Sequence, residues 1–431
     1  SSDITFTPSG SGTLSNFTST NSKTYTVLFT PASATETVTT ISVVSNTITD
    51  LQGLNNAKTA TATISIDNVS PTVTLTDNDS DNLVRADAQV RFEATFSEAM
   101  TASPEINIDL PTSATLTSSM TQSSTSSIWY YDWTVGSGDT GTATITVSGT
   151  DIAGNTYAGT DSLTFEIDTT SPTVTIAIDD DRVNNTDTPT ITFTLSEESN
   201  TFGDGDAIVS DGNIGPLTAT SSTVYTASYT PASNTVTTVT VSVGSGVFTD
   251  MAGNTNTSSS TTFEVDTVSP TLALISDDHD DFIVRDADTV ELTVVFSETM
   301  TNTPTISITG VVTNASMTVS STALSPTWTY TWDVPSGSDG VVSATVSGTD
   351  LFGNYYTILG TDSITYTIDN VSPTVTLTEN DLDDLVREGD QVRFEATFSE
   401  AMTASPVIDI DLPASATLTS SMTQSSTSSI W

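Results

Sequence analysis

Residues 89–98 read Gln-Val-Arg-Phe-Glu-Ala-Thr-Phe-Ser-Glu. The apolar residues Val90, Phe92, Ala94 and Phe96 alternate with polar ones, which is the period of a strand with one buried face. Similar alternation runs through the chain, interrupted by turns rich in Gly, Asp, Asn and Ser. Because helical periodicity is nearly absent, the sequence predicts an all-β protein.

A phrase of the form Asp-x-x-Ser-Pro-Thr recurs four times along the chain. Its prolines, Pro71, Pro172, Pro270 and Pro373, lie about 100 residues apart, which is the size of one small domain per repeat. We therefore predict complete repeats at 69–168, 169–266 and 267–369, the C-terminal part of a repeat at 1–68 and the N-terminal part of another at 370–431. Residues 69–129 and 371–431 differ at only 9 of 61 positions, which indicates duplication within a longer array. Because residues 1–68 lack the opening strands of a domain and residues 371–431 lack the closing ones, we expect the parent polypeptide to extend in both directions.

The strand count of one repeat predicts its architecture. Within residues 69–168 we expect strands near 71–76, 89–97, 105–109, 114–120, 127–135, 142–149 and 162–168. Seven short strands in about 100 residues are typical of an immunoglobulin-like β-sandwich. The expected fold is an all-β tandem array of seven-stranded immunoglobulin-like sandwiches joined end to end.

Aromatic residues alternate in the fifth expected strand of two repeats: Trp129, Tyr131 and Trp133, then Trp328, Tyr330 and Trp332. Such a stripe could stack against sugars at the surface, or it could be the inward face of a core strand. The core interpretation is favoured, because sandwiches need large inward-facing aromatic side chains.

Composition excludes several classes of function. The chain has 431 residues, with 53 Asp+Glu against 8 Lys+Arg and a net charge of −45, which argues against binding to nucleic acid or to an anionic membrane surface. Cysteine is absent and His279 is the single histidine, so neither a disulfide framework nor a thiolate or multi-histidine metal site is possible. No run of about 18 apolar residues predicts a membrane span. The acidic residues lie in repeated loops rather than beside a nucleophile and a base, so no enzyme is expected.

Three acidic motifs recur at the spacing of the repeat proline: an acidic run, a Ser-Glu step and an Asp-x-x-Gly-Asn turn. If successive strands alternate in direction, the acidic run after the first strand lies at the same pole as the aspartate that ends the last strand. The Ser-Glu step and the Asp-x-x-Gly-Asn turn then lie at the opposite pole, which a short linker would bring against the preceding repeat. The expected metal ligands are accordingly the strand-end residues Asp67, Asp168, Asp266 and Asp369; the acidic runs Asp77, Asp79, Asp81, Asp179, Asp180, Asp181, Asp277, Asp278, Asp280, Asp281, Asp381 and Asp383; the glutamates Glu98, Glu197, Glu298 and Glu400; and the turn residues Asp151, Asn155, Asp250, Asn254, Asp350 and Asn354.

Carboxylates gathered in this way repel one another unless a cation or protons neutralise them. The nearby basic residues, Arg85, Arg285, Arg387 and Arg182 of the third repeat, offset one charge each at most. Calcium fits such a set, because it takes six to eight oxygen ligands in flexible geometry, and magnesium fits less well. The alternative is a plain acidic surface, as in salt-adapted proteins. In the first repeat Leu54 replaces the turn asparagine, which argues against ligation by the Asp50 turn.

Several of these motifs together resemble a known family. Ser-Pro-Thr-Val at the repeat start, Phe-Ser-Glu-Ala-Met at 96–100 and 398–402, and Thr-Asp-Met-Ala-Gly-Asn at 249–254 resemble the bacterial immunoglobulin-like repeats of giant cell-surface adhesins. The resemblance implies an extracellular stalk stiffened by calcium that presents a distal binding region, with secretion by a type I or type IX route and roles in adhesion, biofilm formation or gliding attachment. Its partners would be neighbouring repeats of the same polypeptide. Two other interpretations are a subunit of an extracellular filament or surface layer and a carbohydrate-binding module.

Overall fold

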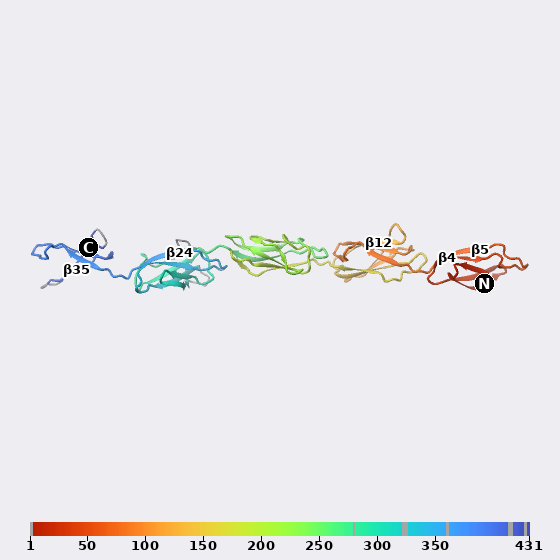
Figure 1. Cartoon of the computed structure of the whole chain (residues 1–431), viewed down its shortest axis with the longest axis horizontal. Coiled ribbons are helices and arrows are strands. Elements are labelled where there is room, and N and C mark those ends of the chain that lie inside the picture. Colours follow the sequence, from red (N-terminus) through yellow and green to blue (C-terminus); the bar gives the residue numbers. More distant parts are fainter. Residues whose placement is uncertain (1–2, 279–280, 321–325, 359–361, 413–416, 426–428) are drawn as a thin grey trace. The chain divides into compact units, whose positions relative to one another are not determined.

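The computed structural model describes residues 3–278, 281–320, 326–358, 362–412, 417–425 and 429–431, and every regular element in these ranges is a β-strand (Figure 1). Within them, no helix is long and apolar enough to cross a membrane. The chain divides into two compact units. One comprises Ser1–Asp181, Thr188–Thr230 and Thr238–Phe263, and the other comprises Arg182–Asp187, Pro231–Thr237 and Glu264–Trp431.

The strands of residues 73–167 form two sheets, with the orders β11-β12-β8-β6 and β10-β9-β13-β14-β7. Their bounds are β6 Val73–Asp77, β7 Leu83–Val84, β8 Gln89–Phe96, β9 Glu105–Asp109, β10 Leu116–Ser119, β11 Thr121–Gln122, β12 Ile128–Thr134, β13 Gly141–Ser148 and β14 Ser162–Ile167.

Both sheets contribute side chains to a shared core. Along β8 every second residue is buried, as the alternation predicts, and Phe92 is fully enclosed. The ring of Phe92 stacks on Trp133 of β12 at 6.0 Å and meets Phe165 of the other sheet edge-to-face at 5.5 Å. The immunoglobulin-like sandwich predicted from the strand count is therefore confirmed.

The structure corrects two details of the expected strand order. The expected strand 114–120 is observed as the shorter β10, and the chain joins the other sheet at β11, just beyond the expected end. The two-residue strand β7, which the sequence does not predict, leaves the first sheet and pairs in parallel with β14, with Leu83 opposite Glu166 and Val84 opposite Ile167. The acidic run therefore lies where the chain crosses from one sheet to the other, between β6 and β7.

Residues 174–266 repeat this arrangement in sheets of order β15-β17-β21-β19, with β20 also paired to β21, and β16-β23-β22-β18. Tyr229 and Phe263 meet edge-to-face at 4.9 Å in this core, and Tyr229 is fully enclosed. The strand bounds are β15 Val174–Ile178, β16 Arg182–Val183, β17 Thr190–Leu195, β18 Ala207–Val209, β19 Asn213–Ile214, β20 Thr218–Ala219, β21 Val224–Thr230, β22 Val236–Val243 and β23 Ser259–Asp266.

Residues 272–368 form a third sandwich, with orders β24-β26-β30-β29 and β25-β32-β31-β27-β28. Its core joins Val290, Leu292, Trp332 and Tyr366, all almost completely buried. The strands are β24 Leu272–Ser276, β25 Ile283–Val284, β26 Thr289–Phe296, β27 Thr305–Ile308, β28 Val312–Ser316, β29 Thr318–Val319, β30 Thr327–Asp333, β31 Gly340–Ser347 and β32 Ile364–Ile368.

The flanking segments form smaller sheets. Residues 4–67 contain the sheet β1-β4-β5 and the hairpin β2-β3, and the C-terminal segment contains the hairpins β33-β34 and β35-β36. The bounds are β1 Ile4–Thr7, β2 Gly12–Asn21, β3 Thr24–Pro31, β4 Glu36–Val43, β5 Ala60–Asp67, β33 Val375–Glu379, β34 Phe394–Phe398, β35 Val407–Ile410 and β36 Leu418–Ser421.

The tryptophan stripe belongs to the cores. Trp129, Trp133, Trp328 and Trp332 are 5%, 3%, 6% and 2% exposed. Stacking on a sugar requires an accessible indole face, so these side chains are not available for it. The core interpretation of the alternating aromatics is confirmed.

Replacing Trp332 by alanine should lower the free energy of unfolding of the 272–368 sandwich by about 3–5 kcal/mol, since the change removes a large buried side chain and leaves a cavity. Val341→Ala in the same sandwich is the control, because Val341 is 70% exposed and its truncation should change stability by less than about 0.5 kcal/mol. Denaturant unfolding followed by hydrogen exchange of β32 measures both effects. Equal losses in the two variants would contradict the assignment of Trp332 to the core.

Candidate functional site: acidic clusters at three strand ends

The Asp-x-x-Gly-Asn segments form the same closed turn in three places. In each, the backbone N–H of the asparagine donates to the aspartate Oδ1, at 2.8 Å for Asn155–Asp151 and 2.9 Å for Asn254–Asp250 and Asn354–Asp350. The asparagine Nδ2 donates to Oδ2 of the same aspartate at 2.8 Å in all three turns. The glycine before each asparagine has φ between about 89° and 98°, a conformation that glycine adopts without strain.

The turn asparagine also holds the end of the preceding repeat's last strand. Its Nδ2 donates to a main-chain carbonyl oxygen, that of Asp67 at 3.2 Å, Asp168 at 2.9 Å or Asp266 at 2.8 Å. One side-chain amide therefore connects a buried aspartate of its own turn to the strand-end aspartate. In the first repeat only one of these two roles is present. Leu54 donates its backbone N–H to Asp50 Oδ1 at 2.9 Å and closes the turn, but it has no side-chain amide that could donate to another strand.

The serine of the Ser-Glu step fixes the glutamate beside this turn. The backbone N–H of Ser97 donates to the carbonyl of Thr72, and the N–H of Thr72 donates to Ser97 Oγ at 3.0 Å. The same reciprocal pair joins Ser196 to Thr173 and Ser297 to Thr271. Because the threonine follows the repeat proline, each glutamate is anchored to the start of its own repeat.

Three carboxylates meet at each of these places. The clusters are Asp67–Glu98–Asp151, Asp168–Glu197–Asp250 and Asp266–Glu298–Asp350, and within each cluster one carboxylate oxygen per residue lies within 4.8 Å of the others. The turn aspartates are the most buried members, with Asp151 and Asp350 fully enclosed and Asp250 3% exposed. Asp266 is buried as well, whereas Asp67 and Asp168 are partly exposed, so the third cluster is the most enclosed.

Crowding of like charges changes the protonation of the glutamates. Burial, followed by the charges of Asp168 and Asp250, raises the pKa of Glu197 to about 7. Burial, followed by Asp266 and Asp350, raises the pKa of Glu298 to about 7. The pKa of Glu98 is also raised, by burial and then by Asp67 and Asp151.

The pKa of the turn aspartate in the first cluster is shifted in the opposite direction. Burial acts to raise the pKa of Asp151, but hydrogen bonds from Asn155 and from the N–H groups of the turn outweigh it, so the pKa lies below the ordinary value. The turn of the first cluster is therefore built to hold a carboxylate anion, while the neighbouring Glu98, whose pKa is raised, can exist as the acid or accept a cation.

The ligand chemistry of the third cluster fits a hard cation. All of its donors are oxygens, as calcium prefers. Asn354 is 3% exposed, and its Oδ1 has no hydrogen-bond partner among the described residues although its Nδ2 is fully used. A buried acceptor without a donor is costly, and a cation would satisfy it.

The expected ligands divide into two groups. The structure brings the strand-end aspartates, the glutamates and the turn residues together at the three clusters, and it places Asp369 beside Glu400, whose pKa is raised by burial and then by Asp369. The acidic-run residues do not belong to a cluster among the described residues. Those residues are Asp77, Asp79, Asp81, Asp179, Asp180, Asp181, Asp277, Asp278, Asp281, Asp381 and Asp383, and Asp280 and His279 lie outside the described residues.

The acidic runs have a local role instead. Asp77 accepts the backbone N–H of Asp79 at 2.9 Å, Asp79 accepts that of Asn82 at 2.7 Å, and Asp81 accepts that of Leu83 at 3.2 Å. These bonds close the loop that carries the chain from β6 in one sheet to β7 in the other. Carboxylates at such positions terminate turns, which is a common use of aspartate.

The position that Arg85 occupies in the second repeat holds a neutral residue in the third repeat. Register with the last strand aligns Val183 with Val84, because each pairs with the equivalent residue of the neighbouring strand. The residue that corresponds to Arg85 is therefore Asn184 rather than Arg182, which lies opposite Glu264. Aligning the repeats on the short parallel strand, rather than on the nearest charged residue, identifies Asn184 as the residue at this position.

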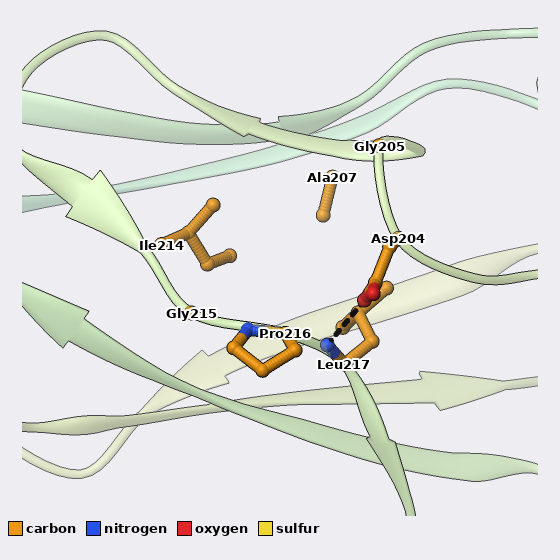
Figure 2. Close-up of a pocket in the computed structure, with 7 residues that line it drawn as sticks. All are labelled: Asp204, Gly205, Ala207, Ile214, Gly215, Pro216 and Leu217. Atoms are coloured by element: carbon orange, nitrogen blue, oxygen red, sulfur yellow. Dashed lines mark hydrogen bonds between the residues drawn. The ribbon is translucent and has the colours of Figure 1, made fainter.

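One surface hollow lies away from the clusters, and another borders the second cluster. The one in Figure 2, between β18 and the segment after β19, is lined by glycine and aliphatic residues, and its single carboxylate, Asp204, already accepts the N–H of Leu217 at 2.7 Å. Another hollow is lined by Asp168, Ser196 and Glu197 together with Leu83 and Gly141, so the second cluster opens to solvent.

The raised pKa values predict an unusual dependence of stability on pH. A carboxyl whose pKa is higher in the folded state binds its proton more tightly there, so the unfolding free energy falls as the pH rises from about 4.5 to about 7. Without divalent cations, the melting temperature should therefore decrease between pH 5 and pH 8. Glu197→Gln should reduce this slope, and Glu264→Gln, which removes an exposed carboxylate of β23, should leave it unchanged. A melting temperature of the wild-type chain that does not change across this interval would contradict the raised pKa values of the two glutamates.

Residues 168–265 match the family model described as a bacterial immunoglobulin-like domain. Similar solved structures include a tetra-tandem repeat from the extending region of a large adhesion protein, at 20% identity over 85% of this chain and 91% of that one, with a TM-score of 0.30. They also include invasin, a bacterial integrin-binding protein, at 18% identity over 70% and 62% with a TM-score of 0.31, and titin domains I67–I69, at 13% over 70% and 99% with a TM-score of 0.32. A comparison with curated proteins finds no match. Residues 168–265 are thus a bacterial immunoglobulin-like domain within a chain of tandem immunoglobulin-like β-sandwiches.

Proposed function

We propose that this chain is a stalk segment of a large bacterial cell-surface adhesin, in which calcium bound at the acidic clusters stiffens the junctions between successive repeats. The observation that carries the proposal is the recurrence of three carboxylates within 4.8 Å at the end of β5, β14 and β23. The repeats would span 69–168, 169–266 and 267–369, with partial repeats at 1–68 and 370–431. The protein would act outside the cell, without catalysis, and would present a distal binding region.

Calcium is preferred to a smaller cation because of the donors. Each cluster offers three carboxylates, and the third adds the unpaired Asn354 Oδ1. Calcium accepts six to eight oxygens at irregular angles, with water completing the set, whereas magnesium requires near-ideal octahedral geometry. The rarity of Lys and Arg in the chain leaves few protein cations to take this place.

The position of the cluster gives the ion its mechanical role. One ligand ends the last strand of a repeat, and the other two belong to the following repeat, at its Ser-Glu step and its closed turn. With the ion, attraction would replace repulsion between these carboxylates, and rotation about the short linker would separate ligands from the metal. Without it, the asparagine amide and protonation of the glutamate would oppose their repulsion.

Calorimetric titration of the metal-free chain should show three calcium sites. At a free calcium concentration of 100 times the dissociation constant, each ion should stabilise its junction by about 2.7 kcal/mol. Glu298→Gln should remove or strongly weaken one site, while Glu291→Gln, which changes an exposed strand residue of the same repeat by the same charge, should keep all three. Equal titrations of these two variants would refute ligation by Glu298.

Small-angle X-ray scattering tests the stiffening separately. Chelation of calcium should shorten the maximum dimension of the chain while the circular dichroism of its strands stays unchanged, since the sandwiches have their own cores. The triple variant Glu98→Gln, Glu197→Gln and Glu298→Gln should give the chelated profile even in calcium. The matched triple variant Glu93→Gln, Glu264→Gln and Glu291→Gln should respond to calcium like the wild type. A maximum dimension that is independent of calcium would overturn the stalk mechanism.

A further inference from the structure

The residue that follows the short parallel strand differs between repeats. Val84, Val183 and Val284 pair with Ile167, Val265 and Ile368, so Arg85, Asn184 and Arg285 occupy equivalent positions next to the end of the last strand. Arg85 is exposed, and Arg285 points toward Asp288 of its own loop at 3.7 Å. Asn184, by contrast, is only 9% exposed.

Every polar group of the Asn184 side chain is engaged. Its Oδ1 accepts the backbone N–H and the hydroxyl of Thr186, both at 2.7 Å, which locks the side chain in one orientation. Its Nδ2 donates to the main-chain carbonyl of Phe352 at 2.8 Å, across 168 residues of sequence. Phe352 lies inside the closed turn Asp350–Asn354.

The contact brings the Asn184 amide close to the glycine of that turn. A Cβ at Gly353 would lie 3.2 Å from Asn184 Nδ2, so the amide rests directly on the turn backbone. At the equivalent place in the preceding repeat, a Cβ at Gly253 would lie 3.4 Å from Cδ of Arg85, an aliphatic carbon. Arg85 therefore packs beside the turn that contains Gly253, whereas Asn184 forms a hydrogen bond with the turn that contains Gly353.

We infer that Asn184 is a positioning residue that holds the Asp350–Asn354 turn in its ligand geometry before any cation binds. Phe352 is fixed from both sides, since its carbonyl accepts from Asn184 and its N–H donates to Asp350 Oδ1 at 2.8 Å. The turn aspartate therefore depends on a bond supplied by the preceding repeat. This preorganisation makes the third cluster the tightest of the three cation sites.

The effect on the turn is independent of the proposed function, whereas the effect on cation affinity rests on it. In the chain with a calcium chelator, Asn184→Ala should make the amides of 350–354 exchange about fivefold faster, the change that corresponds to one net hydrogen bond. The amides of β32, Ile364–Ile368, report the intact core and should not change. Asn185→Ala, which removes an exposed amide from the next residue, is the control and should leave the exchange of 350–354 unchanged.

Cation affinity is measured in a background in which Glu98→Gln and Glu197→Gln disable the first two clusters. In that background Asn184→Ala should weaken calcium binding about fivefold although no ligand is lost. Asn184→Ser is a second variant in case alanine disturbs β32, since serine keeps an acceptor for Thr186 and cannot reach Phe352.

The outcomes separate the two proposals. Faster exchange of the turn in a chain that binds no calcium would support the positioning role and refute the calcium proposal. Unchanged exchange and unchanged affinity in both Asn184 variants would refute the positioning role and leave the calcium proposal standing. Loss of β32 protection in both variants would show that Asn184 supports the fold as a whole, which also overturns the inference.

Discussion

The structure of each junction depends on one side-chain amide in the closed turn. Asn155, Asn254 and Asn354 each donate to the aspartate of their own turn and to the carbonyl of a strand-end aspartate. These bonds bring together carboxylates that would otherwise move apart. An amide is suited to the task, because it supplies two donors without adding a charge of its own. The Asp50 turn, closed but without the asparagine, shows that the geometry of the turn does not require this link.

Burial then determines how strongly each group of carboxylates resists its own charge. The first cluster has one buried member and the third has two, and the raised pKa of Asp266 has burial as its first cause. Like charges repel more strongly in a less polar environment. Ionising all three carboxylates at once therefore costs more free energy in the third cluster than in the first. Such a site gains more from a cation than an exposed one does, since the repulsion that the cation relieves is larger.

The sequence predicted the sandwiches and the gathering of strand-end aspartate, glutamate and turn aspartate, because side-chain alternation and the repeat spacing can both be read directly from the residues. It could not predict β7, whose two residues are too short to show periodicity. That omission had consequences, since the chain changes sheets at β7 and the acidic run before it closes a turn rather than joining a cluster. Asn184 was missed for a related reason. A search for charged residues does not find a neutral asparagine, and the role of Asn184 depends on a partner 168 residues away in the sequence.

The parallel pairing of β7 with β14 and of β25 with β32 has a mechanical consequence. Near the start of a sandwich, the N–H groups of Glu166 and Asp168 donate to the carbonyls of Asn82 and Val84, at 2.8 and 2.9 Å. Tension that pulls the two ends of such a domain apart would load these bonds in shear, across their length and all at once, instead of opening them one by one. Two residues of strand thus place the rupture resistance of a whole domain in a short patch beside its carboxylates.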